Sequence, residues 1–387
     1  MIAPQSIVVS VGYVSLGIGA GYSVTALIAV FAWRWYASRA RQIPAVETPV
    51  TILKPLCGNE PALYEHLRSF CQQQHSEFQI VFGTLDAADP ALAVVTRLIK
   101  EFPEVPIDTV MSAKRHGHNN KTSNLINMLE KARHPVLLIA DSDTWVGPDY
   151  LTTVTAALAD PRVGLVTCLS YDSPTPGLWS RLGAMYSNDW YFPSVMLAWL
   201  FGHQGYASGQ TLCLRRQTLE AIGGLQVMAN HLADDHQLGQ LIREQGLQIV
   251  LSPYEIQAVH HEPDLTALSR HELRWMGTLH VLHPMSFRMI FLTFSLILSS
   301  IGLLLTTGAS PHPVAWALFG VTVAARCGLH VVPRLRFGRP LLGDLLLVPV
   351  RDLLTFGIWF RSFFSRRLTW RGYVFDVDST GLMRRVV

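Results

Sequence analysis

Four polar stretches hold the residue types that could do chemistry in this sequence. The first is DSD (141–143), which follows directly on the apolar run VLLIA (136–140), so that a buried strand ends in two carboxylates. Two Asp residues one position apart can hold a hard cation such as Mg²⁺ or Mn²⁺ through oxygen ligands. The same residues are also typical of an Asx turn, and for an isolated DxD the turn is the better interpretation.

The other three stretches each have a structural explanation when taken singly. A helix N-cap would account for the acids, and a membrane-surface anchor would account for an Arg-Trp pair. Because all of them occur in one ordered series along the chain, a functional explanation is favoured. The stretches are LDAADP (85–90) with Asp86, HLADDHQLG (231–239) with Asp234 and Asp235, and RHELRW (270–275) with Arg274 and Trp275.

The elements that must position these residues are those of an α/β domain. Apolar runs alternate with helical patterns between residues 42 and 280, which favours a parallel sheet with helices on both faces. Ligands bind beyond the carboxyl ends of the strands in such sheets, so Asp86 and Asp141 are expected at one edge. The predicted strands are 50–56, 78–86, 105–112, 135–143 and 163–170, and the predicted helices between them are 63–73, 91–102 and 122–132.

The composition excludes some classes of protein and favours a membrane protein. Hydrophobic residues make up 49% of the 387 residues and charged residues only 15%, which is low for a soluble chain. A net charge of +3 without a long basic run argues against nucleic-acid binding. The five cysteines are odd in number and form no CxxC pair, so we expect reduced thiols with neither a disulfide framework nor a zinc site.

Three uncharged or nearly uncharged segments are long enough to cross a hydrocarbon core, which needs about 20 residues. Arginines at 34, 39 and 41 follow the first segment, and the positive-inside rule places them in the cytoplasm. Residues 341–364 are apolar but interrupted by charge, and a re-entrant or interfacial helix is the preferred interpretation because it keeps the basic C-terminus inside. The expected layout is a transmembrane helix (7–33), a catalytic domain (42–280), a C-terminal membrane region (287–365, with spans at 291–308 and 314–332) and a basic cytoplasmic tail (366–387).

The polar series resembles a known enzyme pattern. Asp86, Asp141-Ser142-Asp143, Asp235 and Arg274-Trp275 resemble the D, D, D, (Q/R)xxRW series of processive and lipid-linked inverting glycosyltransferases. More narrowly, nearly the whole chain is similar to the ceramide glucosyltransferase family, family 21, and KPLCG and LYEHLRSFC are most similar to its hopanoid group. The stretches that carry the similarity are LKPLCGNEPALYEHLRSF, DAADPALAVV, HNNKTSNLINML, DSDTWVGPDYL, ASGQTLCLRRQTLEAIGG, LADDHQLGQLI and WRGYVF.

This resemblance implies a GT-A fold, a UDP-sugar donor and a divalent cation. Asp86 would bind uracil, Lys121 with Asn119 and Asn124 would line the nucleotide pocket, and Asp141 and Asp143 would hold Mg²⁺ or Mn²⁺. Asp235 would act as general base, with Asp234 as the neighbour most easily confused with it. Arg274 would bind the diphosphate and Trp275 would wall the pocket or anchor it at the membrane. His271 stands where the family has Gln or Arg, and it carries charge less reliably at neutral pH.

The resemblance also implies a lipid acceptor, either ceramide or a hopanoid polyol, and UDP-glucose or UDP-N-acetylglucosamine as donor. The expected location is a bacterial inner membrane with the catalytic domain in the cytoplasm. Residues 178–201 are rich in aromatic residues, which suits either an interfacial helix or acceptor groove or else an ordinary core helix of the soluble domain. Two alternatives remain: a processive polysaccharide synthase, and a membrane protein that binds a nucleotide sugar without turnover.

Overall fold

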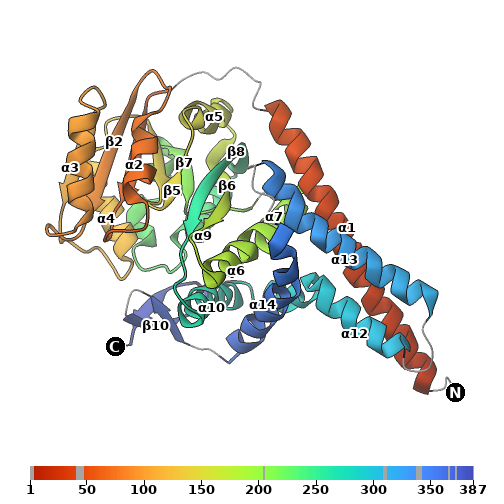
Figure 1. Cartoon of the computed structure of the whole chain (residues 1–387). Coiled ribbons are helices and arrows are strands. Elements are labelled where there is room, and N and C mark those ends of the chain that lie inside the picture. The colour runs from red at the N-terminus through yellow and green to blue at the C-terminus, as the bar shows by residue number, and fades with distance from the viewer. Residues whose placement is uncertain are drawn as a thin grey trace. The chain divides into compact units, whose positions relative to one another are not determined.

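The computed structural model describes residues 4–40, 48–203, 205–307, 312–336, 342–364, 367–370 and 373–386 (Figure 1). The chain divides into two compact units, each built from three separate segments. The helical unit comprises Met1–Trp35, Pro174–Gly202 and Glu262–Gly372, and the sheet unit comprises Tyr36–Ser173, His203–His261 and Tyr373–Val387.

One half of the large sheet is parallel. The strand order is β3-β2-β1-β4-β7-β6-β8-β5, and the first four strands in that order run in one direction. The apolar runs of β1, β2 and β4 are buried on both faces, as parallel strands covered by helices require, whereas β3 at the edge is only partly buried. These strands are β1 (Val50–Pro55), β2 (Phe78–Thr84), β3 (Ile107–Met111) and β4 (Val136–Ala140).

The other half is antiparallel. β7 (Thr211–Arg215) runs antiparallel to β4 and to β6 (Val163–Pro174), and β5 (Thr144–Trp145) runs antiparallel to β8 (Gln248–His260). The α/β class predicted from the sequence is confirmed and agrees with a GT-A fold, but the expectation of a parallel sheet is wrong for this half. An apolar run indicates a strand without indicating its direction, which depends on the route of the connection.

Alternate residues of the central strands feed two apolar cores. On β4, Val136, Leu138 and Ala140 join the core that contains Phe70. Leu137 and Ile139 point to the other core, as the period of two in a strand dictates. The covering helices are α2 (Leu63–Cys71), α3 (Ala91–Glu101), α4 (Asn120–Met128), α5 (Tyr150–Ala156), α8 (Arg216–Ala221) and α9 (Asp234–Glu244), with short 3₁₀ turns at Leu129–Lys131, Ala157–Ala159 and Leu225–Met228.

Among the described residues, two helices are long and apolar enough to cross a membrane, Ser6–Ala40 and Pro313–Leu335. A bent pair, Pro284–Thr293 with Ser295–Thr306, would make a third if it counts as one span. The helices of the helical unit are α1 (Pro4–Ala40), α6 (Leu178–Tyr186), a π-helix (Ser187–Tyr191), α7 (Phe192–Leu200), α10 (Leu265–Leu282), α11 (Pro284–Met289), α12 (Ser295–Thr307), α13 (Pro313–Arg336) and α14 (Val348–Ser362), with 3₁₀ turns at Ile290–Thr293 and Leu342–Leu347.

Two regions that the sequence left open now have defined elements. Residues 178–201 form α6, the π-helix and α7 in the helical unit, so they are not a core helix of the sheet unit. At 15 residues and 1.5 Å per residue, α14 is about 22 Å long, shorter than a hydrocarbon core of about 30 Å. Its interfacial placement stays a prediction.

The C-terminus holds three short strands, β9 (Arg367–Trp370), β10 (Tyr373–Val377) and β11 (Met383–Arg385). β10 and β11 pair antiparallel in the sheet unit, where the sequence predicted only a basic tail. Arg366 and Arg371, two of the basic residues behind that expectation, lie outside the described residues.

Candidate active site

The DSD turn begins where β4 ends, and hydrogen bonds from a buried lysine stabilise it. The Lys54 ammonium on β1 donates to the Asp141 carbonyl oxygen and to Thr144 Oγ1 at 3.2 Å. Thr144 Oγ1 donates to the same carbonyl at 2.8 Å, which closes the turn. Lys54 is fully buried with its ammonium 3.5 Å from the centre of the Phe70 ring. Burial lowers the pKa of Lys54 to about 7, although the charges of Asp143 and Asp141 oppose the shift.

Carboxylates gather around this turn. The Ser142 hydroxyl donates to Glu60 Oε2 at 2.6 Å, so the middle residue of DSD ties the turn to the loop after β1. Burial raises the pKa of Asp143, and the neighbouring charges of Asp141 and Glu60 raise it further. Asp143 Oδ1 is shielded from solvent and has no hydrogen-bond partner among the described residues.

These observations fit a divalent cation. A buried carboxylate oxygen without a donor, beside two more carboxylates, is a costly arrangement for a protein alone. A hard cation with oxygen ligands would satisfy the Asp143 oxygen and offset the like-charge repulsion. Asp141 and Asp143 are therefore the residues that could hold the metal, and their role as ligands stays a prediction.

Lys121 lies near the start of α4 and connects the DSD turn to the second pair of acids. Its ammonium is 2.5 Å from Asp141 Oδ1 and donates to the Gly209 carbonyl at 3.3 Å. Burial disfavours its charge, but Asp141 and Asp234 outweigh burial and raise the pKa of Lys121. The lysine predicted for the nucleotide pocket thus lies at the carboxylates, as a permanent positive charge.

Asp234 and Asp235 open α9, where carboxylates favour the positive end of the helix dipole. Asp235 Oδ2 accepts from the Gly209 amide at 2.9 Å, and its Oδ1 accepts from the His236 amide at 2.7 Å. Burial raises the pKa of both acids, and the Lys121 charge opposes the rise. The two acids and Lys121 interact electrostatically, so the structure brings together Lys121, Asp141 and Asp235, while their roles stay predictions.

The remaining predicted residues of the sheet unit have local roles in the structure. Asp86, just after β2, accepts from the Ala88 amide at 2.9 Å and shapes the turn there. Asn119 is buried and caps α4 by accepting from the Thr122 amide at 3.0 Å. Asn124 donates to the Gly83 carbonyl of β2 at 2.7 Å. Their contact with a nucleotide stays a prediction.

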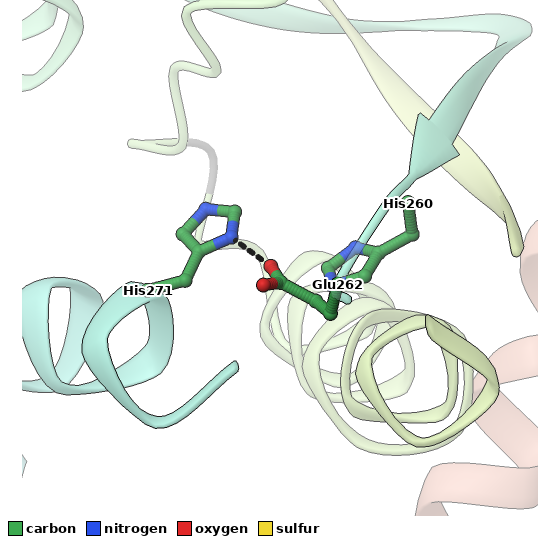
Figure 2. A group of neighbouring side chains, drawn as sticks. All are labelled: His260, Glu262 and His271. Atoms are coloured by element: carbon green, nitrogen blue, oxygen red, sulfur yellow. Dashed lines mark hydrogen bonds and ion pairs between the residues drawn. The ribbon is translucent and has the colours of Figure 1, made fainter. Parts of the chain in front are cut away.

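The RHELRW stretch lies on α10 in the helical unit, which is described by itself. His271 Nδ1 lies 2.7 Å from Glu262 Oε1 (Figure 2), and its ring is 4.2 Å from the Trp275 ring. Trp275 stacks on Tyr186 of α6 with 5.5 Å between ring centres. Figure 2 also draws His260, the last residue of β8 in the sheet unit. Within that unit, His260 Nδ1 lies 3.4 Å from Asp172 Oδ2. The catalytic roles of His271, Arg274 and Trp275 stay predictions.

Two residues of the site, Lys54 and Glu60, escaped the sequence interpretation, as did the bond that Ser142 makes to Glu60. For Lys54 a signal existed, because a lysine inside the apolar run VTILKPL is a charge in a strand that should be buried. Glu60 had no such signal, since an acid in a polar loop is ordinary. Ser142 was read as part of the DSD turn, and its bond to Glu60 depends on a loop conformation that no local pattern specifies.

Comparisons with known proteins give the family. The ceramide glucosyltransferase 1 of Caenorhabditis elegans is 24% identical over 221 residues, which cover 57% of this chain and 47% of that protein. The ceramide glucosyltransferase of Candida albicans is 32% identical over 114 residues, covering 26% and 21%. The matches thus span about half or less of the length of these curated relatives.

Among solved structures, a mannosyltransferase from Pyrobaculum calidifontis in complex with GDP-Man and Mn²⁺ superposes with a TM-score of 0.49 at 18% identity. The superposition covers 90% of this chain and 99% of that one. The family assignment does not depend on it, because the model of glycosyl transferase family 21 matches residues 16–383, nearly the whole chain. The chain therefore belongs to glycosyl transferase family 21.

Proposed function

We propose that this protein is a membrane-bound inverting glycosyltransferase that moves a sugar from a UDP-sugar to a hydroxyl group of a lipid. The convergence of Asp141, Asp143, Lys121 and Asp235 at one edge of the sheet carries the proposal. Family membership supports the transfer reaction, and the relatives named ceramide glucosyltransferase support a lipid acceptor. The two long apolar helices support a membrane location. The arginines at 34, 39 and 41, which follow the first apolar segment, support a cytoplasmic sheet unit through the positive-inside rule.

Asp141 and Asp143 would hold Mg²⁺ or Mn²⁺ beside the diphosphate of the donor. When bound, such an ion neutralises charge that grows on the departing UDP. The protein's own part is to keep two carboxylates in place for it, through the Lys54 bonds beneath the turn and the Ser142 bond to Glu60. Lys121 supplies a second, fixed positive charge next to Asp141.

Asp235 would accept the proton of the acceptor hydroxyl. As that O–H bond breaks, the oxygen forms a bond to the anomeric carbon, and the bond from that carbon to the phosphate oxygen breaks with its electrons leaving on UDP. One such displacement inverts the configuration, so an α-linked donor gives a β-glycoside. The amides of Gly209 and His236 fix the Asp235 carboxylate, which is the orientation that a general base needs.

The donor contacts complete the proposal. Asp86 would accept a hydrogen bond from uracil, with Asn119 and Asn124 near the nucleotide, and Arg274 would bind the diphosphate as a planar fork. Trp275 would form a wall of the donor pocket. His271, one turn earlier on α10, would orient the Trp275 ring by packing against it. We place the acceptor hydroxyl at the level of the lipid headgroups, where ceramide and a hopanoid polyol both present one.

The experiment is a donor and acceptor matrix analysed by mass spectrometry. Purified full-length protein is incubated with Mg²⁺, with UDP-glucose or UDP-N-acetylglucosamine, and with ceramide or bacteriohopanetetrol. A hexosylceramide is the expected product, because the relatives named above are ceramide glucosyltransferases. If the product is an N-acetylhexosaminyl hopanoid, the proposed reaction class stands, and the donor and acceptor are UDP-N-acetylglucosamine and bacteriohopanetetrol instead.

Controls in the same matrix separate enzyme from contaminant. Asp235→Asn should give no product in any combination, while Asp160→Asn, an exposed acid paired with Arg162, should match the unmodified protein. Absence of product in every combination, or polymer in place of a single-sugar lipid, would contradict the proposal.

A further inference from the structure

The last described residues of the chain form a hairpin with a fixed turn. β10 and β11 pair in the register Phe375 with Arg385 and Val377 with Met383. Asp378 Oδ1 accepts from the Thr380 amide at 2.9 Å and from the Leu382 amide at 3.2 Å. Gly381 adopts a φ of 84°, a left-handed conformation that glycine tolerates best. We name residues Tyr373–Arg385 the C-terminal hairpin.

The turn of this hairpin pairs with the segment just before the two acids of α9. The Leu232 amide donates to the Gly381 carbonyl at 3.0 Å, and the Met383 amide donates to the Asn230 carbonyl at 2.8 Å. Between them His231 and Leu382 form an antiparallel bridge. The Met383 side chain is 2% exposed and that of Phe375 is 3% exposed, so the hairpin is packed in place as well as hydrogen-bonded.

The segment 229–232 contacts the start of α4, which carries Lys121, and leads directly into α9, which carries Asp235. On one side the Asn119 amide donates to the Ala229 carbonyl at 2.8 Å, and the Asn119 side chain donates to the His231 carbonyl at 2.9 Å. Asn119 also caps α4, which carries Lys121 two residues later. On the other side the chain runs from Leu232 directly into Asp234 and Asp235 at the start of α9.

The loop before α4 fits closely against the same segment. The His118 amide donates to Asn230 Oδ1 at 3.0 Å. A side chain at Gly117 would place its Cβ 2.3 Å from the Ala229 carbonyl oxygen, closer than any real contact. Rotation or slippage of residues 229–232 would therefore be transmitted to Lys121 as well as to Asp235.

We propose that the C-terminal hairpin is a positioning element that sets the Lys121–Asp235 arrangement through residues 229–232. The inference rests on the proposed function, because it matters for catalysis only if those two residues act there. The hairpin acts on them through its backbone bonds to residues 230–232. Since misplacement of a catalytic group by about 1 Å can cost roughly 100-fold in rate, two such bonds can matter more for turnover than for stability.

A matched pair of variants isolates one of these backbone bonds. Met383→Pro removes the amide that donates to Asn230, and Met383→Ala removes nearly the same side chain while keeping that amide. We expect Met383→Pro to lower kcat at least 10-fold below Met383→Ala, with a smaller change in the KM for the UDP-sugar. Met383→Leu, which keeps both the amide and the apolar volume, should have the kcat of the unmodified protein.

Hydrogen–deuterium exchange supplies a readout that does not depend on activity. In Met383→Pro, amides of residues 116–124 and 229–240 should exchange at least 10-fold faster than in Met383→Ala, while β1 and β4 stay unchanged. Unchanged exchange in both segments would overturn the positioning role even if turnover fell. Equal kcat in the proline and alanine variants would overturn it as well.

The same exchange data separate this inference from the proposed function. If the unmodified protein turned over no UDP-sugar but the proline variant still loosened both segments, the structural link would stand and the transferase proposal would fail. If turnover were present and insensitive to Met383→Pro, the transferase proposal would stand and the positioning role would fail.

Discussion

Acids shielded from solvent occur in both units, buried in the helical unit and partly buried in the sheet unit, and their partners differ. In the helical unit Glu272 forms a bidentate pair with Arg351, at 2.8 and 2.7 Å. Asp352 binds Arg326 in the same manner, at 2.6 and 3.0 Å. Asp189 of the π-helix lies 2.7 Å from His330 Nδ1 and 2.5 Å from Arg334. Each of these carboxylates has a cation of its own.

The sheet unit instead gathers carboxylates against one another. A group of five acids shares the charges of two lysines, Lys54 and Lys121. The acids are Glu60, Asp141, Asp143, Asp234 and Asp235. Burial and like charge raise pKa values there, and one Asp143 oxygen has no donor among the described residues. The contrast teaches that burial of charge alone does not mark a site. An acid paired by two bonds to arginine holds helices together, whereas a group of acids with too few cations, one of them with an oxygen that lacks a donor, marks where an external cation or proton acts.

The largest expected effect comes from removing metal. EDTA should abolish turnover, and Mg²⁺ or Mn²⁺ should restore it, because Asp141 and Asp143 then lack the charge that offsets their repulsion. The measurement is the rate of UDP release before and after readdition. Full activity in chelator would mean that the acids of the sheet unit need no external cation, and the contrast with the paired acids of the helical unit would be lost.

Asp235→Asn should lower kcat by roughly 10²- to 10⁴-fold, the usual contribution of a general base. The asparagine side chain has a single acceptor oxygen and can keep the bond from only one of the Gly209 and His236 amides, so the melting temperature should also fall, but by less than after loss of a buried ion pair in the helical unit. Asp234→Asn should reduce kcat much less. The opposite ranking, measured under saturating donor, would transfer the base role to Asp234.

Breaking a pair in the helical unit should damage stability instead. Arg351→Met leaves Glu272 buried without its cation, which should cost about 3–5 kcal/mol. The double variant Arg351→Met/Glu272→Leu removes both charges and should lie close to the unmodified protein. Denaturation in detergent measures both. Equal losses in the single and double variants would show that the pair does more than compensate charge.

The smallest effect concerns pH. Burial raises the pKa of Asp234 to about 6, against about 4 for an unfolded aspartate. The folded state then binds more protons than the unfolded state between these values, so this group's contribution to stability is lost as pH rises through that window. Asp234→Asn lacks this loss. Its melting temperature relative to the unmodified protein should therefore increase from pH 4 to pH 6 and level off above it. A constant difference would mean that Asp234 is not the titrating acid.

Sequence reasoning succeeded where the pattern is local. Five predicted strands and the helices between them occur within a few residues of their expected bounds, because periodicity and turn residues specify them. It placed the acids at strand and helix ends for the same reason. Asp141 follows β4, and Asp234 begins α9.

It failed where distant segments meet. β7 and β8 were not predicted, and the Lys54 bonds to Asp141 and Thr144 join residues far apart in the chain. The C-terminal hairpin looked like a basic tail because its burial depends on pairing with residues 230–232, which no local pattern reveals. Of the paired acids of the helical unit, Asp352 was visible only as a charge that interrupts residues 341–364. The pairing of Glu272, in the RHELRW stretch, and of Asp189, in the aromatic stretch 178–201, was not predicted.

The most direct test of the central claim is metal binding at the DSD turn, measured without catalysis. Mn²⁺ is titrated into the full-length protein and followed by electron paramagnetic resonance, with Asp143→Asn and the exposed control Asp160→Asn in parallel. The account predicts one Mn²⁺ site that weakens at least 10-fold in Asp143→Asn and is unchanged in Asp160→Asn. Equal Mn²⁺ affinity in all three proteins would contradict it.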